Sequence, residues 1–144
     1  MLSAALLSVL ITAQPTKFQE LKFELPTSWK LKASPQVAPS DFLTSTWNAP
    51  GDKELHITHW AGFPKHDGGA MVIARQWDLF AAGQKTRLIE TSFFQGQKSK
   101  VLVLFLVRGK GRYRIHTRNV SRRSVLSLAS TLAFESVPTP PAER

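Results

Sequence analysis

Cysteine is absent from the 144 residues of the chain. This absence excludes disulfides, thiolate catalysis, zinc–thiolate sites and iron–sulfur clusters held by cysteine. It is also compatible with an oxidising compartment, where an unpaired thiol is a hazard. The fold must therefore be stabilised by a hydrophobic core, and a chain of this length can bury enough surface to form one domain.

Sequence signatures of catalysis and metal binding are also lacking. The chain has no Gly-x-Ser-x-Gly elbow and no His-Glu-x-x-His pair. His56 and His59 fall in a predicted strand, where a spacing of three places side chains on opposite faces. We predict no catalytic residue, no metal and no cofactor. An enzyme whose site is assembled from distant residues stays as an alternative.

Long apolar runs are scarce, and none reaches the roughly 20 residues that a membrane-spanning helix needs. Residues 2–11 are apolar or small and carry no charge, and the length of this run is typical of the h-region of a secretory signal. Residues 11–13 form an acceptable cleavage site. No Lys or Arg precedes this run, which indicates that the basic start of the signal lies upstream of Met1. A buried N-terminal helix is the alternative to a signal peptide. We expect residues 1–13 to be a signal peptide, the protein to be periplasmic or secreted, and the mature chain to lack a transmembrane span.

Acidic residues are missing from one third of the chain. Residues 91–134 contain nine Lys or Arg and no Asp or Glu, whereas the remainder balances ten basic against ten acidic residues. The whole formal net charge of +9 therefore lies in this segment. Such an asymmetry indicates an anionic partner or surface, and a merely solvated basic face is the alternative.

The hydrophobic patterning predicts one α+β domain over residues 14–135, followed by a flexible proline-rich tail at 136–144. Strands are predicted at 17–25, 41–48, 54–60, 86–94, 100–108 and 113–118, with a short one near Phe134, and amphipathic helices at 70–82 and 121–132. The apolar run 101–107 indicates a central strand buried on both faces. The predicted fold is a central, mostly antiparallel sheet of about five to seven strands with two flanking helices.

The densest group of cations follows the tight turn at 109–111. Strand alternation places every second residue from 112 to 118 on one face, and all four are basic or histidine. The next predicted helix opens with a serine and two arginines, where free N–H groups and the helix dipole also favour an anion. We predict an anion-binding surface formed by Arg112, Arg114, His116, Arg118, Ser121, Arg122 and Arg123. The alternative is a solvent-facing strand whose arginines pair with acidic residues of the first half.

Three functional classes follow from these features. The first is a non-catalytic module that binds a protein partner or an anionic envelope component through the basic strand and helix start. The second is an accessory factor or chaperone that holds a peptide or lipid in an apolar cleft, and the third is an enzyme with an unrecognised site. Nucleic acid is disfavoured as a partner, because the aromatic residues lie at core positions of other elements and export removes the protein from the cytoplasm.

Three stretches resemble the PsbP-like family, which includes bacterial DcrB-like proteins. They are FELPTSW at 23–29, a predicted helix with a tryptophan at 75–77, and the closing segment VLSLASTLAF at 125–134. The resemblance covers nearly all of residues 18–136. It implies a central antiparallel sheet flanked by helices and a largely non-enzymatic protein that binds other proteins. It carries no functional residue to this chain.

Overall fold

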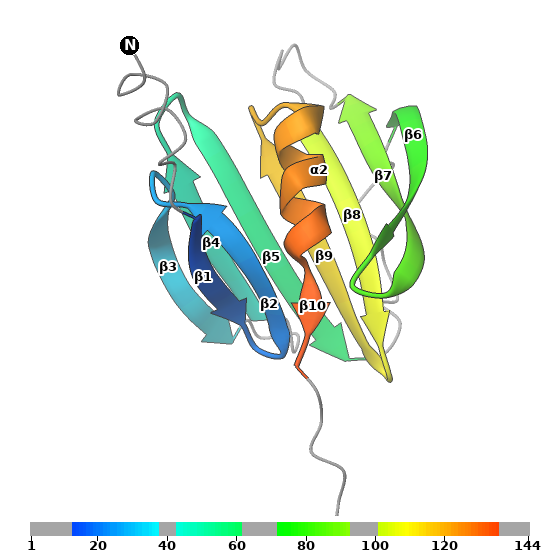
Figure 1. Ribbon diagram of the computed structural model, residues 1–144, viewed down its shortest axis with the longest axis horizontal. Coiled ribbons are helices and arrows are strands. Elements are labelled where there is room, and N and C mark those ends of the chain that lie inside the picture. Colours follow the sequence, from blue (N-terminus) through cyan, green and yellow to red (C-terminus); the bar gives the residue numbers. More distant parts are fainter. Residues whose placement is uncertain (1–12, 38–42, 62–71, 93–100, 136–144) are drawn as a thin grey trace, which may run out of the picture.

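The computed structural model describes residues 13–37, 43–61, 72–92 and 101–135, and these form two antiparallel sheets and one helix (Figure 1). The large sheet has seven strands in the order β3-β4-β5-β9-β8-β7-β6. Its strands are β3 (Lys30–Val37), β4 (Leu43–Ala49), β5 (Lys53–Ala61), β6 (Val72–Ala81), β7 (Gln84–Ser92), β8 (Val101–Arg108) and β9 (Gly111–Arg118). Every neighbouring pair in this sheet is antiparallel.

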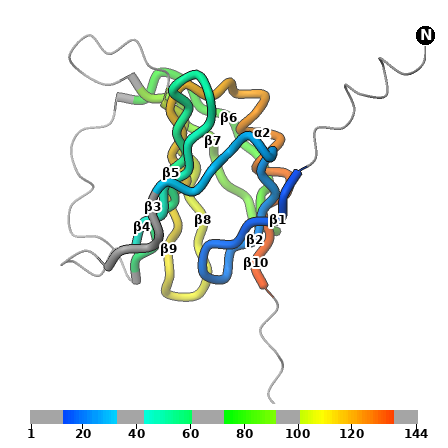
Figure 2. The backbone as a smooth tube through the Cα atoms, turned by 90° about the vertical axis from the view of Figure 1, so that its left-hand side faces the viewer, coloured from blue at the N-terminus to red at the C-terminus, as the bar shows by residue number. Residues whose placement is uncertain are grey.

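A second layer covers one face of the large sheet, as Figure 2 shows from the side. It consists of the helix α2 (Arg122–Thr131) and a small sheet in the order β1-β2-β10. The strands of the small sheet are β1 (Ala13–Phe18), β2 (Leu21–Pro26) and β10 (Ala133–Phe134). Strand β10 follows α2 directly and pairs with the first residues of β2, which holds the C-terminal end of α2 next to the small sheet (Figure 1).

The hydrophobic core lies between the two layers. Alternation in β2 buries Leu21, Phe23 and Leu25 while Lys22 and Glu24 stay exposed. From α2, the residues four apart that point inward are Val125 and Ala129, as the helical spacing predicts. The large sheet supplies the opposite wall with Leu55, Ile57, Leu88, Leu102, Leu104, Leu106, Tyr113 and Ile115.

The predicted helix at 70–82 is wrong, because residues 72–81 form strand β6. Ala82 and Gly83 both have positive φ, at 51° and 75°, and Ala81 pairs with Gln84. Two central residues of this kind make the two-residue turn that joins hairpin strands. Gly83 therefore ends a hairpin turn rather than a helix. Trp77 faces the core, whereas its neighbours Gln76 and Asp78 are exposed, as expected for alternation along a strand. The apolar residues of this segment also fit helical spacing, which led to the wrong prediction.

Other predictions are confirmed or refined by the described residues. The helix at 121–132 is present, and Ser121 caps it by accepting a hydrogen bond from the Ser124 backbone N–H at 3.2 Å. The strand at 100–108 is buried on both faces over residues 101–104, as expected. The predicted strand at 17–25 is a hairpin instead. The central sheet has seven strands, within the predicted five to seven, but the described residues form one flanking helix rather than two, and the three-stranded sheet was not predicted.

The ends of the chain bear on the predicted domain limits. The expected tail at 136–144 and all but the last residue of the expected signal peptide lie outside the described residues. Ala13 is the first residue of β1, paired with Pro26. Within the part of the chain that the structure describes, no helix is both long and apolar enough to cross a bilayer.

Candidate functional site

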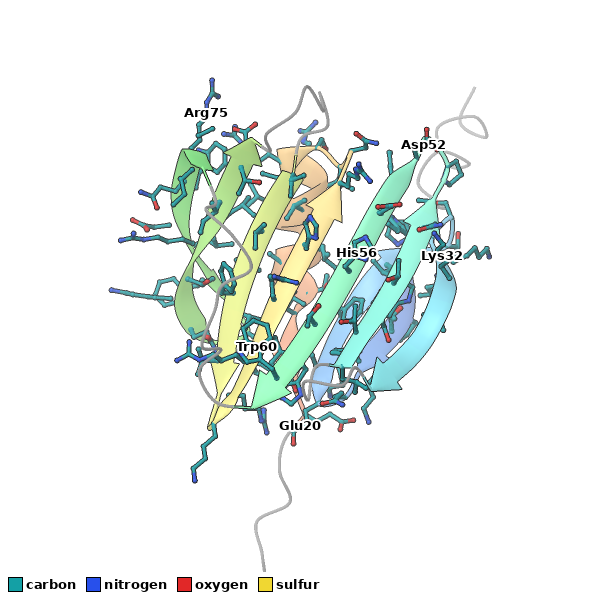
Figure 3. All side chains as sticks on the ribbon, turned by 180° about the vertical axis from the view of Figure 1, so that it is seen from behind. Glu20, Lys32, Asp52, His56, Trp60 and Arg75 are labelled. Carbon is teal, nitrogen blue, oxygen red and sulfur yellow. The ribbon has the colours of Figure 1, made fainter. Side chains whose placement is uncertain are left out.

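The predicted cations of β9 share one face of the large sheet, the face turned away from α2. Tyr113, Ile115 and Thr117 are buried in the core, so the residues between them point the other way. His56 and Trp60 of β5 lie on this same face, in register with His116 and Arg112 (Figure 3). The predicted alternation of β9 is therefore confirmed.

Most of these side chains are already engaged in the fold. Arg118 Nη1 lies 3.6 Å from Glu54 Oε2. The Arg112 side chain also interacts with other residues of the fold. The His116 ring stacks on His56 with 5.4 Å between ring centres. Burial lowers the pKa of His116 to about 4, with the nearby His56 and Arg114 adding to the effect, so this ring is neutral at pH 7. Arg114 is the exposed cation of the group.

The two arginines of α2 lie on the opposite side of the sheet from the β9 cations. Arg122 Cζ is 4.6 Å from the centre of the Trp77 ring, and Trp77 packs against the core between the layers. Arg123 borders a cleft beside α2. Ser121 is occupied as the helix cap. The seven predicted site residues thus form two separate groups on opposite faces of the large sheet.

A cleft with a volume of about 650 Å³ lies beside α2. It lies between α2, the end of β2 and the turn that joins β4 to β5. Its walls are mostly apolar, and the apolar side chains include Leu25, Trp29, Leu55, Val125 and Leu128. A cleft of this size with apolar walls is within the range of small-molecule sites.

One end of the cleft is closed by a contact between α2 and β2. Thr131 Oγ1 accepts a hydrogen bond from the Glu24 backbone N–H at 3.0 Å, and the Thr131 hydroxyl donates to the Leu128 carbonyl at 2.8 Å. The register of β10 on β2 places the last turn of α2 at this end. The first turn of α2 therefore lies at the other end, beside the β4–β5 turn.

The open end of the cleft is positively charged. Lys53 begins β5 and Arg123 lies in the first turn of α2, and both side chains are exposed. The first turn of α2 contains no acidic residue, so its own partial positive charge is not neutralised from within the helix. Glu24, the carboxylate that also borders the cleft, belongs to the closed end.

The three histidines that the structure describes do not converge on a metal or catalytic site, and His66 lies outside the described residues. His56 Nδ1 lies 3.0 Å from Thr46 Oγ1, and His56 Nε2 lies 3.3 Å from Glu54 Oε2. His59 is on the opposite face, where its ring packs against Tyr113 with 4.6 Å between ring centres. The prediction that His56 and His59 point to opposite faces is confirmed. Among the residues described, no group of three or more potential ligands could hold a metal ion.

Comparison with known proteins yields a match at the level of the fold. No protein-family model and no curated protein matches the sequence. Nine chains of solved structures match the fold. One is the solution structure of cyanobacterial PsbP (CyanoP) from Synechocystis sp. PCC 6803. The match covers 87% of this chain and 94% of that chain, with a TM-score of 0.62 and 12% identity. The fold is PsbP-like.

The PsbP-like fold explains the two layers but assigns no role to a residue, because 12% identity supports the architecture alone. An apolar cleft was expected from the sequence without its residues, and Lys53 and Trp29 were not predicted to border it. One signal was available in the printed sequence. Ser124, Ser127 and Thr131 follow one another at helical spacing, and this row of small polar residues borders the cleft.

Proposed function

We propose that the protein is an exported, non-catalytic binding module that holds an apolar ligand in the cleft between α2 and β2. The observation that carries the proposal is the cleft itself, whose apolar walls enclose about 650 Å³ beside the helix. Export is supported by the uncharged apolar stretch at residues 2–11. The absence of catalytic sequence signatures favours binding over chemistry.

The apolar walls give the cleft a reason to take up a ligand. Leu25, Leu55 and Val125 are each at most 2% exposed, so the floor of the cleft is part of the core. An apolar ligand that covers the remaining wall removes its own surface and that of the wall from water, and this is favourable in proportion to the area covered.

A paired substitution on α2 tests this function. Ser127 borders the cleft, whereas Ser130 is exposed on the same helix and does not border it. We expect Ser127→Trp to fill the cleft and to abolish binding of the uncharged fluorescent probe N-phenyl-1-naphthylamine, while Ser130→Trp keeps it. Equal binding by both variants, or no binding by the unmodified protein, would rule out the cleft as a ligand site.

A second candidate function is the binding of an anionic partner on the β9 face. It is favoured by the exposed side chain of Arg114, which stands between Arg112 and Arg118 on that face. Binding directed by charge weakens steeply with salt, whereas apolar capture does not. We expect Arg114→Ser to elute earlier from a heparin column than Lys22→Ser. The Lys22→Ser variant is the control, because it removes one positive charge from β2, in the layer on the other side of the large sheet. If the two variants elute together, the β9 cations do not form a specific anion-binding surface and serve only to keep the protein in solution.

A further inference from the structure

We propose that the ligand of the cleft is a long-chain fatty acid, with its acyl chain against the apolar walls and its carboxylate between Lys53 and Arg123. This inference rests on the proposed function and specifies the ligand of the same site. It is carried by two observations: the separation of charge along the cleft, and the hydrogen-bonding state of the β2 edge that forms one wall.

The charges are arranged for an elongated ligand with one anionic end. Lys53 and Arg123 border the open end, and the apolar residues Leu25, Leu55 and Val125 lie deeper. Within the described ranges, neither cation forms a salt bridge with a carboxylate. The partial positive charge at the first turn of α2 points to the same end. A single carboxylate there gains two cationic neighbours without leaving the solvent entirely.

The β2 edge that faces α2 is unsuited to a peptide ligand. Every second residue of β2, namely Lys22, Glu24 and Pro26, turns its backbone groups toward this edge. Lys22 pairs with Ala133 of β10, the Glu24 N–H donates to Thr131, and Pro26 has no N–H.

The Pro26 carbonyl on the same edge is also used, because it accepts a hydrogen bond from the Trp29 backbone N–H at 3.0 Å. An extended peptide binds a sheet edge through main-chain hydrogen bonds, and this edge has no N–H left to donate. An acyl chain needs none. The wall therefore favours a hydrocarbon chain over a polypeptide.

The test is displacement of N-phenyl-1-naphthylamine from the purified full chain at pH 8 by three amphiphiles with the same alkyl chain. These are myristate, 1-tetradecanol and tetradecyltrimethylammonium, which carry an anionic, a neutral and a cationic head. We expect myristate to displace the probe at a concentration about tenfold below that of the alcohol, since each exposed ion pair contributes a factor of a few. The cationic amphiphile is expected to be the weakest of the three.

Charge-reversal variants assign this preference to the two cations. In Lys53→Glu/Arg123→Glu the advantage of myristate over tetradecanol disappears, while the alcohol displaces the probe as before. The matched control is Lys30→Glu/Lys110→Glu, which reverses two exposed charges that do not border the cleft and keeps the preference. Loss of the preference in both double variants would show a general charge effect and overturn the assignment.

The remaining outcomes separate the two proposals. Equal displacement by myristate and tetradecanol would contradict the fatty acid and leave an apolar-ligand module. Displacement by an apolar decapeptide but by none of the three amphiphiles would make the ligand a peptide. If the probe does not bind the unmodified protein, or binds Ser127→Trp equally well, the proposed function fails and the fatty acid with it.

Discussion

Arg122 of α2 lies over Trp77 of β6, with its guanidinium carbon 4.6 Å from the centre of the indole ring. This contact joins the first turn of the helix to the far edge of the large sheet, since β6 is the last strand in the sheet order. It also explains why the helix arginines and the β9 cations do not form one surface. Arg122 is drawn to the covered face, whereas Arg112, Arg114 and Arg118 point to the other.

The contact predicts a difference between the two adjacent arginines. Arg122→Ala is expected to lower the free energy of unfolding by about 0.5–1 kcal/mol through loss of the cation–π interaction. Arg123→Ala, whose side chain has no such ring contact in the described structure, is expected to change it by less than about 0.5 kcal/mol. Both variants remove one cation from the first turn of α2, so the effect on the helix dipole cancels between them. Urea denaturation measures the difference, and equal losses would contradict the contact.

The hairpin turn between β6 and β7 predicts a stabilising substitution. Ala82 has a φ of 51°, which is unfavourable for alanine and better tolerated by asparagine. Ala82→Asn creates the Asn-Gly pair that two-residue hairpins prefer, and we expect it to raise the free energy of unfolding by about 0.5–1 kcal/mol. In a helix the same change would be destabilising, because alanine is the best helix former. A lower thermal midpoint for Ala82→Asn would therefore argue for the helix and against the strand.

The buried His116 predicts a loss of stability in mild acid. Its pKa is lowered from 6.5 to about 4 in the folded protein, so between these values the unfolded chain binds more protons. This contribution to stability is complete above pH 6.5 and is lost as the pH falls toward 4. We expect the free energy of unfolding to fall by about 1–2 kcal/mol between pH 7 and pH 5 on account of this residue.

His116→Gln is the variant that isolates this effect, because it removes the titration at that position. Burial also lowers the pKa of His59, which acts in the same direction and persists in the variant. Hydrogen bonding to His56 lowers the pKa of Glu54, but that carboxyl titrates below the window used here. An unchanged slope of stability against pH in His116→Gln, measured by urea denaturation, would contradict the assignment.

The closed end of the cleft predicts a local effect of Thr131. Thr131→Val removes the acceptor of the Glu24 N–H and is expected to cost about 0.5–1.5 kcal/mol. Thr131→Ser keeps the hydroxyl and serves as the control. Amide hydrogen exchange at Glu24 reports the contact directly, with faster exchange expected in the valine variant alone. Equal exchange rates in both variants would show that this end is not held by the hydrogen bond.

Much of the large sheet follows from sequence patterns, and the exceptions have physical reasons. The run at 101–107 identifies a strand buried on both faces, and Ser121 together with the apolar spacing of α2 identifies the helix. Residues 72–81 fit the period of a helix and that of a strand equally well. Trp77 and Ala81 are four residues apart, a spacing that places side chains on one face in either element. The deciding contact, pairing with β7, depends on the turn at Ala82 and Gly83.

The candidate site was harder to predict than the fold. Alternation along β9 places Arg112 and Arg118 on one face correctly, but it gives no information on which face α2 covers. The helix start is close to β9 in sequence, yet it crosses to the other side of the sheet. The cleft is formed by β2, the β4–β5 turn and α2, which are brought together only by the docking of the small sheet. No local pattern encodes that arrangement.

Methyl NMR of the protein titrated with myristate tests the central claim most directly, because it locates the ligand at single residues. Our account predicts shifts for the methyl groups of Leu25, Val125 and Leu128, which border the cleft, while Leu104 and Leu106 elsewhere in the core stay unchanged. The shifts should be absent in Ser127→Trp and present in Ser130→Trp. Shifts confined to Val101 and Val103 on the opposite face, or no shifts at all, would contradict a ligand site beside α2.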